Sequence, residues 1–150
     1  MLADLISSEL PYLRRYARGL MGEQQNGDAA VEDMIESLIF RMSVAPEMKF
    51  HKADLFAELD KTVRARVMAL PEDSCLGRIL NLMTTEERRA LLLTVVEGFT
   101  VQESADILGI ANGEVEDTLR NAEKSIAFLV SNVSPISITV VIPSFSNVGK

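Results

Sequence analysis

The sequence predicts an all-α protein built from two small helical lobes, of which the second contains a helix-turn-helix. Apolar residues recur at spacings of three and four through most of the chain, which is typical of amphipathic helices. The segment "LPEDSC" interrupts that pattern near the middle with proline, aspartate and serine. The chain has 150 residues, of which 47% are apolar and 25% charged, and this composition is typical of a folded soluble protein.

The first lobe is predicted to span residues 1–70 and to contain three helices. The first helix ends at Gly22, and a loop is expected over residues 22–28. The second helix ends before Pro46, and the third is predicted over residues 52–70. The apolar faces of these helices consist, in order, of Leu13, Tyr16, Ala17 and Leu20; of Val31, Met34, Ile35, Leu38 and Met42; and of Leu55, Leu59, Val63 and Val67.

Three arginines, Arg14, Arg15 and Arg18, lie opposite the apolar face of the first helix. We expect them to form a solvated face or salt bridges to the other lobe, and contact with nucleic acid is the alternative.

The second lobe is predicted over residues 76–131, after a hinge at 71–75. A short helix is expected over residues 76–83. Thr84 and Thr100 each precede a glutamate by three residues, so each pair can form a capping box at a helix start. The last helix starts near Asn112 and buries Val115, Leu119, Ala122 and Ile126. Residues 132–150 contain the β-branched run "ISITVVI" and form a tail or the remnant of another domain.

The helix-turn-helix carries a charge opposite to that of a DNA reader. A small residue at the helix crossing and a glycine at the turn fit the motif, although an ordinary helical hairpin has the same spacing. Residues 112–126 contain four acidic and two basic residues, a balance of −2, and the whole chain has a net charge of −7. Because DNA affinity depends on basic groups that displace counterions from phosphates, direct DNA binding is not expected.

Other functional classes find little support in the sequence. Cys75 is the only cysteine and His51 the only histidine, so neither an internal disulfide nor a cysteine and histidine metal cluster can form. We find no catalytic constellation, no cofactor motif, no signal peptide and no membrane span, and we expect a cytoplasmic protein that is not an enzyme.

Two segments resemble a known family. "LPYLRRYARGLMGEQQNGDAAVEDMIESLI" resembles the start of sigma factor region 2, and "MTTEERRALLLTVVEGFTVQESADILGIANGEVEDTLRNAEKSI" resembles region 4. In this order they resemble the sigma-like domain of PhyR-type response regulators, which imitates an extracytoplasmic-function sigma factor, over about residues 5–130. Where region 4 of true sigma factors tends to carry Lys, Ser and Arg, this chain has Glu116, Asp117 and Thr118.

The resemblance implies a partner switch in a bacterial general stress response. The sigma-like domain binds a NepR-type anti-sigma factor, expected at 1:1, and so releases the true sigma factor. Full-length members carry a receiver domain in cis, and "ISITVVI" could be its first strand. The alternative function is that of a divergent sigma factor, or another helix-turn-helix regulator, that binds DNA directly.

The partner is expected to wrap amphipathic helices around both lobes, so exposed edges and acidic residues are the candidate contacts. For the apolar candidates the alternative is plain core packing, and for the acidic ones it is a solvated helix face. The predicted partner-binding residues are Tyr16, Asp33, Glu36, Glu97, Phe99, Leu108, Ile110, Glu114 and Glu116.

Overall fold

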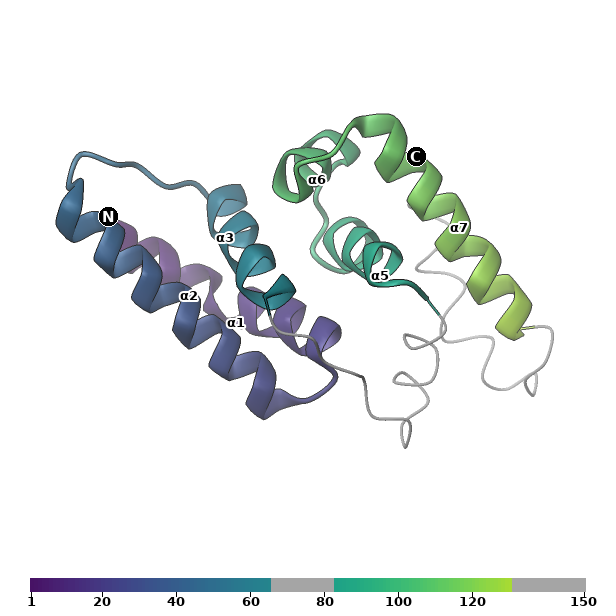
Figure 1. The fold of residues 1–150 in the computed structure, drawn as a ribbon, viewed down its shortest axis with the longest axis horizontal. Helices are drawn as coiled ribbons and strands as arrows, with labels where there is room; N and C mark the ends of the chain where they lie inside the picture. Colours follow the sequence, from purple (N-terminus) through teal and green to yellow (C-terminus); the bar gives the residue numbers. More distant parts are fainter. Residues whose placement is uncertain (66–82, 131–150) are drawn as a thin grey trace. The chain divides into compact units, whose positions relative to one another are not determined.

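The computed structural model describes residues 1–65 and 83–130, and in these ranges the chain forms helices and no strand. The predicted all-α fold is confirmed. The chain divides into two compact units, Met1–Leu70 and Pro71–Lys150 (Figure 1). Four predictions lie wholly or partly outside the described residues: the hinge at 71–75, the short helix at 76–83 up to residue 82, the end of the third helix and the tail at 132–150.

The first unit is a bundle of three helices, α1 (Leu2–Met21), α2 (Gln24–Val44) and α3 (Lys52–Arg64). Each helix contacts the other two. Gly22 ends α1 in the left-handed conformation at φ 82°, as the sequence predicted. The predicted apolar faces supply the core, whose buried residues include Leu13, Tyr16, Ala17, Leu20, Val31, Met34, Leu38, Leu55, Phe56 and Leu59.

The loop predicted over residues 22–28 is wrong, because α2 already begins at Gln24. A glycine stands inside this helix because α1 and α2 approach each other closely at Gly27. A Cβ atom on Gly27 would lie 2.9 Å from the backbone nitrogen of Arg18. Glycine is therefore a contact residue inside the helix here, where the letters "NGD" alone suggested a turn.

The second unit contains α5 (Thr85–Leu91), its π-helical continuation η1 (Leu92–Val96), α6 (Val101–Leu108) and α7 (Asn112–Val130). Both predicted threonine caps are present. The Thr84 hydroxyl accepts from the Glu87 backbone N–H, and Thr100 forms a complete capping box with Glu103. Helices α5 and α6 both pack on α7. The core includes Leu91, Leu93, Phe99, Ala105, Ile107, Leu108, Val115, Ala122 and Ile126.

Candidate partner-binding surfaces

Helices α6 and α7 form the predicted helix-turn-helix around Gly109. Gly109 ends α6 at φ 72°, and the N–H groups of Gly109 and Ile110 both donate to the carbonyl of Ala105. Beyond the turn, the Asn112 side chain donates to Gln102 Oε1 at 2.8 Å. Backbone and side-chain hydrogen bonds thus fix where α7 starts relative to α6, which is the arrangement of a DNA-reading motif.

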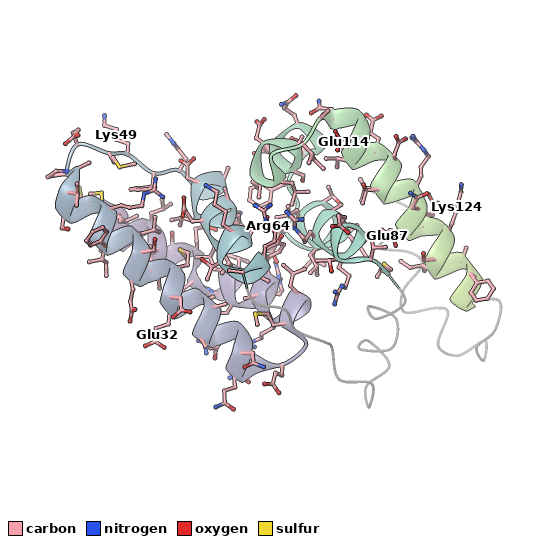
Figure 2. All side chains as sticks on the ribbon, viewed as in Figure 1. Glu32, Lys49, Arg64, Glu87, Glu114 and Lys124 are labelled. Atoms are coloured by element: carbon pink, nitrogen blue, oxygen red, sulfur yellow. The ribbon has the colours of Figure 1, made fainter. Side chains whose placement is uncertain are left out.

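The outer face of α7 is acidic. Glu114 lies near the start of the helix and Lys124 farther along it (Figure 2). Glu114, Glu116 and Asp117 are exposed, as is Glu123. Arg120, one of the two basic residues of the predicted reading helix, is paired with Asp117 on the same helix. The surface that would enter a major groove therefore presents carboxylates, which DNA phosphates repel.

The predicted contact residues of the second unit differ in exposure. Glu114 and Glu116 are exposed, while Glu97 and Ile110 are half-buried. Phe99 and Leu108 are buried at 7% and 6% exposure. The helix pair therefore presents the acidic candidates outward and packs these two apolar candidates into its core. Contact of any of them with a partner stays a prediction.

Tyr16, predicted as a contact, links α1 to α3 inside the first unit. Its side chain is fully buried, and its hydroxyl donates to Asp60 Oδ1 at 2.8 Å. The second oxygen of the buried Asp60 carboxylate lies 3.1 Å from Arg64 Nε. The ring meets Phe56 edge to face, with centroids 5.7 Å apart. These contacts give Tyr16 a structural role, whatever it contributes to binding.

A groove of about 410 Å³ runs between α1 and α2 on the first unit. Its apolar wall includes Leu10, Val31 and Ile35, and its acidic rim includes Glu32 and Glu36. Of the predicted contacts, Glu36 is thus placed at a concave surface. Asp33 is exposed on the same helix. An apolar wall with an acidic rim suits a side chain or helix that is apolar on one side and basic on the other.

An ion pair between Arg14 and Asp28 lines part of the groove. Arg14 donates to both oxygens of Asp28, from Nε at 2.9 Å and from Nη2 at 2.8 Å. These hydrogen bonds hold the pKa of the Asp28 carboxyl below its usual range. Arg18 lies 3.8 Å from the same carboxylate. Arg14 and Arg18 thus pair with α2 of their own unit. Salt bridges of the arginine face to the other lobe stay a prediction.

The outer side of the C-terminal part of α2 is an exposed apolar surface that was not predicted from the sequence. Ile39, Phe40 and Val44 are exposed by 59%, 69% and 70%. Their sequence positions could have predicted this surface. None of the three belongs to the apolar stripe predicted for the buried face of this helix.

Neither a metal centre nor a membrane helix is found in the part of the chain that the structure describes. No group of three His, Cys, Asp or Glu side chains there could hold a metal ion. No helix there has the length and apolar character needed to cross a membrane.

Family models and relatives agree with this architecture. The model for the Sigma2 domain of PhyR matches residues 6–59, and the model for the sigma-like domain of the response regulator PhyR matches residues 80–128. Together they cover more than half of the chain. The phyllosphere-induced regulator PhyR of Methylorubrum extorquens is 33% identical over 134 residues. That match covers 83% of this chain and 49% of the regulator, so the chain spans about half the length of this curated relative.

Two solved structures are similar over most of the chain. One is the co-crystal structure of anti-anti-sigma factor PhyR complexed with anti-sigma factor NepR from Bartonella quintana, with 26% identity and a TM-score of 0.70. It covers 97% of this chain and 62% of the matched chain. The other is the sigma factor RpoE in complex with NepR from the same organism, with a TM-score of 0.73. It covers 87% of this chain and 96% of the matched chain, and at 18% identity it shows the fold alone.

Proposed function

Because the chain belongs to the family of PhyR sigma-like proteins, we propose that it binds a NepR-type anti-sigma factor and so releases a sigma factor. Of the two similar structures, one contains PhyR and the other a sigma factor, each in complex with NepR. A chain with the fold of a sigma factor can compete for the same partner. In this proposal the complex is 1:1, and the response it serves is a bacterial general stress response.

The observation that carries the proposal is the acidic outer face of α7. Glu114, Glu116 and Asp117 are exposed where a sigma factor would read promoter DNA. The carboxylates repel phosphate and attract basic side chains, so the same residues favour a basic protein partner and disfavour DNA. A sigma-like shape with this charge supports a mimic rather than a promoter reader.

The alternative is a regulator that binds DNA directly, and the helix-turn-helix geometry around Gly109 is the feature that favours it. The two functions differ in their response to salt. Direct DNA binding should weaken steeply as salt rises, whereas docking of amphipathic helices on apolar grooves should weaken much less.

Several further parts of the proposal follow from the family. The chain acts as a regulatory binding protein, without catalytic activity of its own, in the cytoplasm where sigma factors work. In a longer protein of this family, a receiver domain in cis would control access to the sigma-like surfaces. For this chain, control by a receiver is a proposal that requires the longer protein for its test.

Isothermal titration calorimetry of the chain with a purified NepR-type anti-sigma factor tests the proposal. We expect a stoichiometry near one and little or no binding to duplex promoter DNA in a parallel titration. Replacing Glu114, Glu116 and Asp117 together with lysine should weaken partner binding about tenfold or more, because three attractive charges become repulsive. Salt-sensitive binding of the unmodified chain to DNA, with no affinity for the anti-sigma factor, would favour the alternative.

A further inference from the structure

The outer side of α2 exposes an apolar surface that its own unit does not cover. Phe40 and Val44 lie one helical turn apart, and Ile39 lies beside Phe40. All three are more than half exposed. Scattered exposed apolar residues are ordinary, but large neighbouring ones on a single face are typical of an interaction site.

Acidic residues continue this face toward the start of α2. Glu32, Asp33 and Glu36 are exposed, and Glu36 lies one turn before Phe40. Figure 2 shows Glu32 on the outer side of the helix. The outer face of α2 is therefore divided, with carboxylates on its earlier turns and apolar side chains on its last turns. From Glu32 to Val44 it extends for about 18 Å, or three to four helical turns.

The helix dipole and the arginines of α1 do not explain the positions of Glu32 and Glu36. They lie two or more turns beyond the start of α2 at Gln24, and the helix dipole acts mainly within the first turn. Arg14 and Arg18 of α1 are paired with Asp28. Within the described ranges, neither Glu32 nor Glu36 forms an ion pair, so both charges are available to a basic group from outside.

We propose that the outer face of α2 docks one amphipathic helix of the anti-sigma factor in a fixed direction. Apolar side chains of that helix cover Ile39, Phe40 and Val44. Its basic side chains face Glu32 and Glu36, so they lie over the earlier turns of α2. This inference rests on the proposed function and adds the surface, the charge pattern and the direction of one bound segment.

Two features favour a helix of that chemistry over another occupant. The charge of the acidic turns is complementary to lysine and arginine, which a second copy of this acidic chain would supply poorly. The face also continues into the groove between α1 and α2, because Glu36 lies on both surfaces. A helix that packs on α2 can therefore place a side chain in the groove.

The test measures the dissociation constant of a fluorescently labelled NepR-type anti-sigma factor for the full chain by anisotropy. Phe40→Gln should raise it about tenfold or more, because large anchors dominate interface energies. Glutamine retains good helix propensity, and the side chain is exposed, so circular dichroism should show an unchanged fold. Tyr12→Gln is the matched control, because Tyr12 is an exposed aromatic residue of the same unit that lies on α1 and does not line the groove. It should change the constant less than twofold.

A second variant tests the acidic half of the face. Glu32→Gln combined with Glu36→Gln should weaken binding severalfold at low salt and reduce the dependence of binding on salt. If the unmodified chain binds and Phe40→Gln has no effect, or the same effect as Tyr12→Gln, the inference is overturned and the proposed function stands. An unchanged salt dependence in the acidic variant overturns the assigned charge pairing and direction. Failure of the unmodified chain to bind overturns the proposed function, and the inference falls with it.

Discussion

The hydrogen bond between Tyr16 and Asp60 should contribute about 2 kcal/mol to the stability of the first unit. Both side chains are fully buried, and the hydroxyl lies 2.8 Å from Asp60 Oδ1. Hydrogen bonds to charged groups contribute about 1.5–3 kcal/mol, and a buried acceptor that loses its donor cannot turn to water. In Tyr16→Phe the ring keeps its contact with Phe56, so the loss comes from the hydroxyl alone. Arg64 still neutralises the carboxylate, which places the expected loss near the middle of that range.

Amide hydrogen exchange read by mass spectrometry is the suitable assay, because it reports the stability of α1 to α3 separately from that of the second unit. A loss of about 2 kcal/mol should speed exchange of the most protected amides about 30-fold. Tyr12→Phe is the matched control. Tyr12 is 42% exposed, so its variant should stay within about 0.5 kcal/mol of the unmodified chain. If Tyr16→Phe also changes stability by less than about 0.5 kcal/mol, the buried bond does not hold α1 to α3 as argued.

Three further predictions concern individual positions. The Ser104 hydroxyl is buried and has no hydrogen-bond partner among the residues that the structure describes, so Ser104→Ala should leave the thermal stability of the second unit unchanged or raise it by up to about 1 kcal/mol; a clear loss would reveal a partner. Gly109→Ala should lower the stability of the second unit by about 1–2 kcal/mol, because φ 72° disfavours a side chain. Amide exchange in α6 and α7 should therefore be faster, and unchanged exchange would contradict this. Asp28 has a lowered pKa, so its ionised form stabilises the fold above the unfolded pKa of about 3.9, and this contribution disappears as pH falls through the lower folded pKa. The stability difference between the unmodified chain and Asp28→Asn should therefore vanish in acid, and a difference that persists there would exclude the ion pair with Arg14 as its cause.

Local patterns predicted the features that depend on neighbours in sequence. The apolar stripe of α1 follows from spacing along a single helix, and the Gly22 and Thr100 caps follow from the chemistry of helix ends. The acidic character of α7 could also be read directly, because residues opposite a buried stripe face solvent.

Contacts between helices could not be predicted in the same way. Gly27 resembled a turn residue, but it lies inside α2, where the close approach of the Arg18 backbone leaves no room for a side chain. The pairing of Arg14 with Asp28 likewise depends on which faces of α1 and α2 meet. Phe99 and Leu108 show the same limit, because a position in an amphipathic pattern does not reveal whether an apolar side chain lines a groove or fills the core.

The central claim, competition for an anti-sigma factor, is tested most directly by a release titration. A labelled sigma factor is first bound to its NepR-type anti-sigma factor, and the chain is then added while anisotropy follows the labelled protein. We expect stoichiometric release, with anisotropy falling to that of the free sigma factor. The variant in which lysine replaces Glu114, Glu116 and Asp117 should release less. Anisotropy that stays at the value of the complex with excess chain present would contradict the account.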